Sequence, residues 1–300
     1  MKPMNKMKLI FTLFLFIATS CLKAQDGTIA PPSQEKQDSL AALYDQIRNA
    51  EWKSFEAAEG ITWKHFHFND LYSSKQFITV IEVDLNKGIS IDLPYVTEGF
   101  MKTSEAAAKA GAVVAINGSF FDTKVGGSTV FLKKDGKVIN ETRKDFTHYR
   151  EEAGFAVDNT GKVTIVKRPG ENMGGWNSVD AKTLLASGPL LVYDGELVEP
   201  LDKPFNTNRH PRTAIGVTAD KRVICVVVDG RSSESYGMSI PELAKVMHAL
   251  GCNEAMNLDG GGSSTAWVQG KGIVNHPTDN KKFDHEGERS VANAILFMLP

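Results

Sequence analysis

Short turns between β-rich runs recur through the middle of the chain, and they constrain its fold more than any other feature. Three contain glycine, at residues 135–136, 159–161 and 194–195, and a fourth lies at residues 219–221. A short turn between two β-rich runs is typical of a β-hairpin, in which neighbouring strands run antiparallel. The middle of the chain therefore predicts antiparallel sheet rather than alternating βαβ units.

Segments with the spacing of a helix are few. The clearest begins after Ser239, which is a good N-cap, and ends at Gly251. A short alanine-rich helix is expected to begin at a cap formed by Thr103 or Ser104 and to run to Ala110.

Near the N-terminus, apolar residues recur at near-helical spacing over residues 38–58. This spacing predicts one or two amphipathic helices that end near Gly60. The predicted fold class is therefore α+β: a mixed, largely antiparallel sheet with few helices, plus an N-terminal helical appendage. Further strands are expected at residues 76–85, 89–96, 112–117, 254–258 and 290–298, with another hairpin at residues 265–274.

The first 24 residues have the pattern of an export signal. Three lysines precede an apolar stretch, Leu9–Ala18, which is too short to span a bilayer as a stable anchor. Cleavage after Ala24 and lipoprotein processing at Cys21, with residues 1–20 as the signal, both remain open. In either case we expect an exported protein, in the periplasm or as an outer-membrane lipoprotein of a bacterium. Any membrane attachment would be through a lipid at Cys21.

The length of 300 residues suits one large domain, or one domain with an appendage. We expect residues 1–24 to be the signal, residues 25–75 a tether with the N-terminal helical segment, and residues 76–300 the main domain. The formal net charge of −2 gives no reason to expect nucleic acid as a partner.

Two cysteines follow the signal, Cys225 and Cys252. An exported protein could join them in a disulfide. However, Cys225 lies inside an apolar run and Cys252 at the expected end of a helix, so two buried free thiols are an equally good interpretation.

Residues 257–265 read Asn-Leu-Asp-Gly-Gly-Gly-Ser-Ser-Thr. Three consecutive glycines allow positive φ angles and let backbone N–H groups converge, and such a concavity binds anions. The following hydroxyls could add donors, and Asp259 stands beside the glycines as an acid, a base or a sugar ligand. A tight turn or bulge between two strands is the alternative interpretation.

Four other segments have a similar polar and glycine-containing character. Asn117, Asp229 and Asp259 each follow a short apolar run, and motifs at strand ends are a usual way for a fold to gather distant residues into one pocket. The four segments are 115–122 (Ala-Ile-Asn-Gly-Ser-Phe-Phe-Asp), 208–216, 228–231 and 289–294.

Within these motifs, Arg212 lies beside Thr213, Arg231 follows Gly230, and Arg289 begins the last strand. A guanidinium group binds phosphate through a planar fork of N–H donors. A single arginine is more often a surface charge or part of a structural ion pair, but three in such contexts indicate an anionic ligand. The glycine-rich stretch suits the same phosphate.

The five motifs resemble those of the phosphodiester glycosidase family, and a pair of carboxylates is the common means of cleaving the glycosidic bond that this resemblance implies. We expect Asp229 and Asp259 to be this pair, with Asp259 as base or nucleophile, and Asp122 or Glu254 as substitutes. A phosphate leaving group departs as a stabilised anion, so a general acid matters less. Arginines and backbone N–H groups could then carry much of the catalysis.

The five motifs, in this order, resemble those of the phosphodiester glycosidase family over about residues 76–299. The resemblance implies hydrolysis of a sugar-1-phosphodiester, which releases the sugar and leaves the phosphate on the other alcohol. For an exported bacterial protein, the substrate would be a surface polysaccharide, a teichoic-acid-like polymer or another glycan phosphodiester. Asp259 and Asp229 are the implied catalytic residues, and His210 also lies in a motif. The residues implied in binding substrate and phosphate are Asn117, Ser119, Arg212, Thr213, Arg231, Gly260, Gly261, Ser263, Arg289 and Asn293.

Two other functions remain open from the residues themselves. A non-catalytic glycan- or phosphate-binding surface lipoprotein would keep the arginines and show binding without turnover. A metal-dependent phosphodiesterase would break the P–O bond and would need a cluster of metal ligands. The seven histidines, however, are scattered along the chain. His65 and His67 could face one side of a strand without a third ligand nearby. No cofactor is implied with certainty, and a divalent cation at Asp229 and Asp259 stays an open interpretation.

Overall fold

The computed structural model describes residues 34–300, so the expected signal and the tether before residue 34 lie outside the described residues. The chain divides into two compact units, Met1–Ser39 and Leu40–Pro300. The first helix, α1 (Gln34–Arg48), begins in the first unit and ends in the second. The architecture below is that of the second unit.

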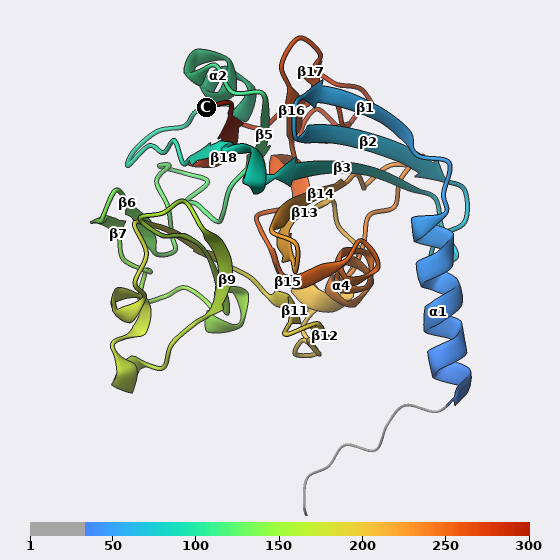
Figure 1. Ribbon diagram of the computed structural model, residues 1–300, viewed down its shortest axis with the longest axis horizontal. Coiled ribbons are helices and arrows are strands. Elements are labelled where there is room, and N and C mark those ends of the chain that lie inside the picture. Colours follow the sequence, from blue (N-terminus) through green and yellow to red (C-terminus); the bar gives the residue numbers. More distant parts are fainter. Residues whose placement is uncertain (1–33) are drawn as a thin grey trace, which may run out of the picture. The chain divides into compact units, whose positions relative to one another are not determined.

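An eight-stranded sheet runs through this unit (Figure 1). Every pairing between its neighbouring strands is antiparallel, as the hairpin turns predict. Its strands, in spatial order, are β1 (Lys53–Ala58), β2 (Ile61–Phe68), β3 (Gln76–Asp84), β14 (Arg222–Val228), β13 (Arg212–Thr218), β15 (Cys252–Asn257), β11 (Leu190–Tyr193) and β12 (Glu196–Leu197).

Two five-stranded antiparallel sheets complete the β structure of the described residues. One contains, in order, β7 (Lys137–Asn140), β6 (Leu132–Lys134), β10 (Thr183–Ser187), β8 (Ala153–Val157) and β9 (Val163–Lys167). The other contains β17 (Gly272–Ile273), β16 (Ala266–Val268), β5 (Val114–Asn117), β18 (Ala294–Met298) and β4 (Ser90–Asp92).

Helices are few, as expected. Besides α1 they are α2 (Thr103–Ala110), α3 (Pro204–Thr207) and α4 (Ile240–Ala249). Short 3₁₀ turns lie at Leu85–Lys87, His148–Arg150, Glu171–Met173, Gly175–Ser178 and Gly261–Ser263. Within residues 34–300, no helix is long and apolar enough to cross a membrane.

The two faces of the large sheet pack into different hydrophobic cores, because successive side chains of a strand point to opposite faces. On β14, Val223, Cys225 and Val227 face a core shared with both small sheets. Ile224 and Val226 face the core that contains α4 and part of α1. The apolar run of β14 is therefore continuous because both of its faces are buried.

Ser239 caps α4 as predicted: its side chain accepts from the Glu242 N–H, and Glu242 accepts from the Ser239 N–H. The predicted cap of α2 is wrong, because the N-cap is Lys102 and makes no side-chain capping bond. Instead, the carboxylate of Glu288 accepts from the N–H and hydroxyl of Ser104. A distant acidic residue therefore satisfies this helix end.

The prediction of helix through residues 38–58 is correct only as far as Arg48. The rest forms β1, in which Phe55 pairs with Trp63 of β2 and stacks on its ring at 4.6 Å. Cross-strand pairing thus outweighs the local helical spacing. Cys225 and Cys252 are both free and buried, and burial raises the pKa of each thiol.

The motifs meet because of strand direction. β13 runs antiparallel to both β14 and β15, so β14 and β15 end at the same edge of the sheet, with Asp229 and Asp259 just beyond. The end of β5, in a small sheet, adjoins this edge, since the Asp259 N–H donates to Gly118 O at 3.1 Å. Three motifs that are distant in sequence are thus neighbours.

Candidate active site

The glycine-rich loop after β15 is packed too closely for side chains. A Cβ on Gly260 would lie 2.6 Å from Pro211 O, and one on Gly261 would lie 3.0 Å from the Arg231 guanidinium. At Gly262, a Cβ would meet Arg289 Nη2 at 2.5 Å. The loop therefore holds two arginine side chains against its backbone, which only glycine permits.

The N–H groups of Gly260 and Gly261 are used within the protein, so these two residues do not offer the open donors that the sequence predicts. Gly260 N–H donates to Asp259 Oδ1 at 3.0 Å, and Gly261 N–H donates to Pro211 O at 2.8 Å. Ser263 N–H and Ser264 N–H donate to loop carbonyls and close a 3₁₀ turn. These four donors are used to fold the loop.

Asp259 lines a cavity of about 230 Å³ and is partly exposed to it. Burial raises the pKa of Asp259. The Ser263 side chain, the Gly260 N–H and the positive charges of Arg150 and Arg289 act in the opposite direction. Ser263 Oγ lies beside the carboxylate, although it has no hydrogen bond of good geometry within the described residues. No residue in 34–300 makes an ion pair with Asp259 within 4.0 Å.

The wall of the cavity is aromatic and cationic. Arg150 stands between rings, with its guanidinium carbon 4.5 Å from the Phe120 centroid and 4.2 Å from that of Phe205. Its Nε is buried and has no hydrogen-bond partner among residues 34–300. Arg150 is in no sequence motif, so sequence reasoning missed it. The lining residues are Phe120, Phe121, Thr123, Thr129, Arg143, Asp145, Phe146, Arg150, Asp259 and Arg289.

Two of the three predicted phosphate-binding arginines lie at the glycine loop. Arg231 is exposed, has a φ of 60°, and forms no ion pair within the part of the chain that the structure describes. Arg289 lines the cavity and donates from Nε and Nη2 to Asp279 Oδ1 at 2.8 and 2.5 Å. Beside them, burial lowers the pKa of His210, and the charges of Arg212 and Arg231 lower it further.

The third arginine, Arg212, is not placed for direct phosphate binding. It is 1% exposed, and it donates to the backbone carbonyls of Met238, Phe205 and Asn208 at 2.6–3.0 Å. Burial lowers the pKa of Arg212 to about 9, so the group stays charged at neutral pH. Its position supports the loop under the site, which corrects the expected ligand role.

Asp229 does not line the cavity of Asp259. It is 1% exposed, and its carboxylate accepts from Asn275 Nδ2 at 2.9 Å and from His276 N–H at 3.0 Å. His276 Nδ1 lies 2.8 Å from Asp229 Oδ2. The two aspartates of the expected pair therefore differ in environment, because the loop that contains Asn275 and His276 donates hydrogen bonds to Asp229.

The remaining predicted polar residues brace the motifs from beneath. Asn117 Oδ1 accepts from the Thr213 hydroxyl at 2.7 Å, and Asn117 Nδ2 donates to Asp259 O at 2.8 Å. Asn293 Oδ1 accepts from Ser119 N–H at 2.6 Å. All four side chains are at most 1% exposed. Asn117 thereby holds the backbone carbonyl of Asp259, Thr213 supports Asn117, and Asn293 holds the backbone of Ser119.

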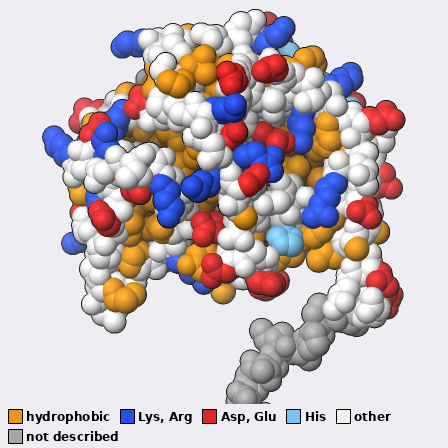
Figure 2. Space-filling model, viewed as in Figure 1, with side chains coloured by type: hydrophobic (Ala, Val, Ile, Leu, Met, Phe, Trp, Pro, Cys, Tyr) orange, Lys and Arg blue, Asp and Glu red, His pale blue; other side chains and the backbone are white. Residues whose placement is uncertain are grey.

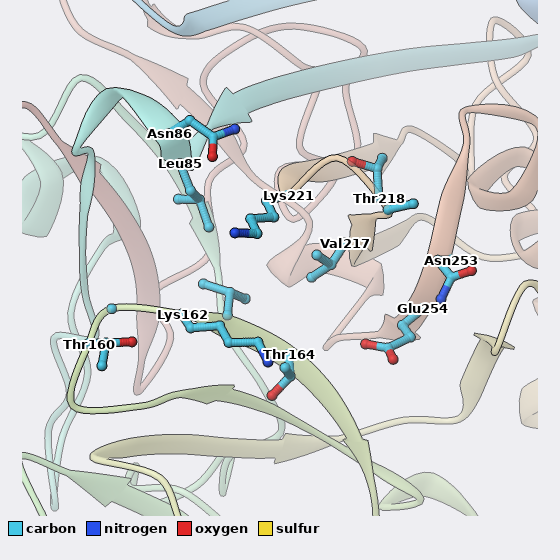
Figure 3. Close-up of a pocket in the computed structure, with 13 residues that line it drawn as sticks. Leu85, Asn86, Thr160, Lys162, Thr164, Val217, Thr218, Lys221, Asn253 and Glu254 are labelled. Atoms are coloured by element: carbon cyan, nitrogen blue, oxygen red, sulfur yellow. The ribbon is translucent and has the colours of Figure 1, made fainter.

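The substitute carboxylates lie elsewhere. Asp122 pairs with Arg143 at 2.6 Å and accepts from two backbone N–H groups, which hold its pKa below the ordinary value. Glu254 lines a different cavity of about 550 Å³, beside Val217 and Lys221 (Figure 3). Because β13 runs from the motif edge to Thr218, this cavity lies at the opposite end of that strand.

No group of three or more His, Cys, Asp or Glu within residues 34–300 is arranged to hold a metal ion. His65 stacks on Phe77 at 5.3 Å, and His67 Nε2 lies 2.7 Å from Glu234 O. On the face shown in Figure 2, basic and acidic side chains are interspersed.

The sequence profile of the phosphodiester glycosidase family matches residues 110–298, and the chain belongs to this family. It is 28% identical over 280 residues to the SPbeta prophage-derived uncharacterized protein YomE of Bacillus subtilis (strain 168). The aligned region is 89% of this chain but only 38% of YomE, so the chain spans well under half of that relative.

Solved structures share the fold. One is the catalytic domain of zebrafish N-acetylglucosamine-1-phosphodiester alpha-N-acetylglucosaminidase, auto-inhibited by its pro-peptide. Its TM-score is 0.63 at 19% identity, covering 84% of this chain and 92% of that one. Another is a hypothetical protein from Synechocystis, with a TM-score of 0.60 at 18% identity, covering 83% of this chain and 64% of that one.

Proposed function

We propose that this protein hydrolyses a sugar-1-phosphodiester by cleaving the glycosidic C–O bond. The observation that carries this proposal is the setting of Asp259: a carboxylate without an ion-pair partner in residues 34–300, in a cavity that also contains Arg150 and Arg289. Family membership supports the reaction class.

The proposed reaction uses the groups of this cavity in two ways. Asp259 removes a proton from a water molecule as the oxygen of that water attacks the anomeric carbon. The bond from that carbon to the phosphate oxygen breaks, and its electron pair leaves with the phosphate. Arg150 and Arg289 of this cavity stabilise the departing anion, and Arg231, which packs against Gly261, adds positive charge, so no acid is needed to protonate the anion.

The aromatic wall suits the sugar. The rings of Phe120, Phe121 and Phe146 line one cavity together with the hydroxyls of Thr123 and Thr129. Apolar ring faces combined with a few polar groups are typical of small-molecule sites.

The test is hydrolysis of α- and β-linked sugar-1-phosphodiesters by the purified protein in ¹⁸O-labelled water, with and without a chelator. We expect the label in the released sugar. Label in the phosphate would mean P–O cleavage and would overturn the proposal in favour of a phosphodiesterase. Saturable binding without turnover on every substrate would favour a binding protein.

We propose further that the protein acts outside the cytoplasm, after export on its N-terminal signal. The basic and apolar pattern of residues 1–20 supports this, and a putative exported protein of Burkholderia pseudomallei K96243 has a related fold, with a TM-score of 0.54 at 19% identity. Mass spectrometry of the mature N-terminus, in wild type and Cys21→Ala, separates lipidation at Cys21 from cleavage after Ala24. An uncleaved cytoplasmic protein would contradict export.

A further inference from the structure

A cavity of about 550 Å³ at the far end of β13 from Asp259 has no part in the reaction proposed above (Figure 3). Residues of two sheets line it: the end of β13 and the start of β15 from the large sheet, and the turn between β8 and β9 from a small one. Small-molecule sites are commonly cavities of about 300–1,000 Å³. The volume therefore suits a small ligand.

The base of this cavity is apolar. Val163 and Val217 are 5% and 8% exposed and belong to the core that the large sheet shares with both small sheets. Leu85 packs against that core beside them. Aliphatic groups of a ligand that contact these side chains leave water, which is favourable. The base therefore suits an aliphatic group.

Three charged side chains stand around this base: Lys162, Lys221 and Glu254. None of them forms an ion pair within 4.0 Å among residues 34–300. Glu254 is partly buried, and its Oε2 accepts from Ile165 N–H at 3.3 Å. The two lysine side chains have no hydrogen bond in the same part of the chain. The cavity thus presents two free ammonium groups and one carboxylate.

The acidic residues next to these lysines in sequence have other partners. Asp158 accepts from Thr160 Oγ1 at 2.7 Å and from the Lys162 N–H at 3.0 Å. Asp220 pairs with Arg222 at 2.9 Å. Two ammonium groups that face one cavity repel each other, and an anion between them offsets that repulsion. The two lysines therefore favour a carboxylate or another anion.

Glu254 sets a second requirement on the ligand. An anion alone would bring like charge towards this partly buried carboxylate, which is unfavourable. A ligand that also carries an ammonium group would pair with Glu254, whose Oε1 has no hydrogen bond within the described residues. A ligand with charges of both signs therefore matches the charges of the cavity.

The backbone of Lys221 is in the left-handed region, with a φ of 67°, and its N–H donates to Thr218 O at 3.0 Å. Glycine is the usual residue at this position of a hairpin turn, because a side chain is strained there. Figure 3 shows the lysine side chain among those that line the cavity. Strained backbone of this kind clusters at ligand sites, which supports a use for this side chain.

We propose that this cavity binds an aliphatic amino acid, or a dipeptide of such residues, through both charged ends. The carboxylate binds between Lys162 and Lys221, and the ammonium group binds Glu254. The aliphatic side chain contacts Val163 and Val217. This cavity shares no lining residue with that of Asp259, and the inference does not depend on the reaction proposed there.

Isothermal titration calorimetry of the purified protein with four probes tests the site. L-leucine and L-leucyl-L-leucine carry both charges, 4-methylpentanoate carries only the carboxylate, and L-leucinamide carries only the ammonium group. At least one of the two zwitterions is expected to bind about tenfold more tightly than either singly charged probe, because each of those lacks one ionic contact. The tighter zwitterion shows whether the ligand is the free amino acid or the dipeptide.

Two lysine variants test where the probe binds. Lys162→Met and Lys221→Met should each weaken binding of the tighter zwitterion about tenfold. Lys271→Met is the matched control. Lys271 is also an exposed lysine of a hairpin turn, and its N–H donates to Val268 O at 3.0 Å, but it does not line the cavity. Binding by the control should equal that of wild type.

Glu254→Gln separates a ligand role from a structural one, because it keeps an acceptor for Ile165 N–H. It should weaken binding of the zwitterion about tenfold and strengthen binding of 4-methylpentanoate, since it removes a negative charge beside the site. The inference would be overturned if neither zwitterion bound at millimolar concentration, or if a singly charged probe bound as tightly. Unchanged zwitterion binding in the Lys162, Lys221 or Glu254 variants, or an equal loss in Lys271→Met, would also overturn it.

Discussion

Asp229 and Asp259 occupy equivalent positions in the sheet but different environments. Each follows the end of a strand next to β13, and each is followed by glycine. Asp229 receives hydrogen bonds from Asn275 and His276 and is 1% exposed. Asp259 receives a hydrogen bond from Gly260 and opens on a cavity.

The difference comes from the segment that covers each strand end. The loop after β17 places Asn275 and His276 on Asp229, so its carboxylate is saturated with donors. Beside Asp259, Arg150 and Arg289 form no ion pair with the carboxylate in residues 34–300, and a cavity remains between these groups. A satisfied carboxylate stabilises the fold, whereas an unsatisfied one with a raised pKa is a candidate for chemistry.

The largest expected effect is on activity at Asp259. Asp259→Asn keeps the shape of the side chain but removes the base, so kcat should fall by roughly 10³-fold. The measurement is steady-state hydrolysis of the preferred phosphodiester, with circular dichroism to show that the fold is intact. A folded variant with wild-type kcat would remove Asp259 from the proposed mechanism.

At Asp229 the main expected effect is on stability. Asp229→Ala leaves buried donors of Asn275 and His276 without an acceptor, which should lower the free energy of unfolding by roughly 3 kcal/mol. Urea unfolding, followed by fluorescence, measures this. A variant as stable as wild type but inactive would give Asp229 the catalytic role and erase the contrast.

The pH dependence of activity is the third way to sharpen the comparison. Because a base must be deprotonated, kcat should rise with pH through the pKa of Asp259, which burial places above the ordinary value of 3.8. The pH profile of kcat measures this. An acidic limb at or below pH 3.8 would contradict the raised pKa.

A smaller effect is expected on the stability of the Asp259 variant. Folding raises the pKa of Asp259, so its favourable contribution is present below the unfolded pKa and is lost as pH rises through the folded one. At pH 7, Asp259→Asn should therefore melt at a higher temperature than wild type, and the difference should shrink towards pH 3. Differential scanning calorimetry at both pH values measures it, and a lower melting temperature at pH 7 would contradict the sign.

The comparison also shows how far sequence reasoning reaches. The hairpin turns predicted antiparallel sheet, because turn residues are a local feature. Polar motifs after apolar runs predicted that Asn117, Asp229 and Asp259 would gather in one pocket; Asn117 contacts Asp259, but Asp229 does not line its cavity. Sequence reasoning did not assign the donors around Asp229, which come from residues 46 and 47 positions away. It also missed Arg150, whose position depends on Phe120 and Phe205 from distant segments.

The smallest expected effect is at Glu254, a carboxylate that sequence reasoning treated as a substitute for Asp259. It lines the cavity at the far end of β13, and its Oε2 accepts from Ile165 N–H at 3.3 Å (Figure 3). Glu254→Gln keeps an acceptor for that N–H and removes only the charge, so kcat/KM should stay within about twofold of wild type. The same hydrolysis assay measures this beside Asp259→Asn. A large loss of kcat at intact stability would show that the cavity of Glu254 takes part in the reaction, and would move the site away from the glycine loop.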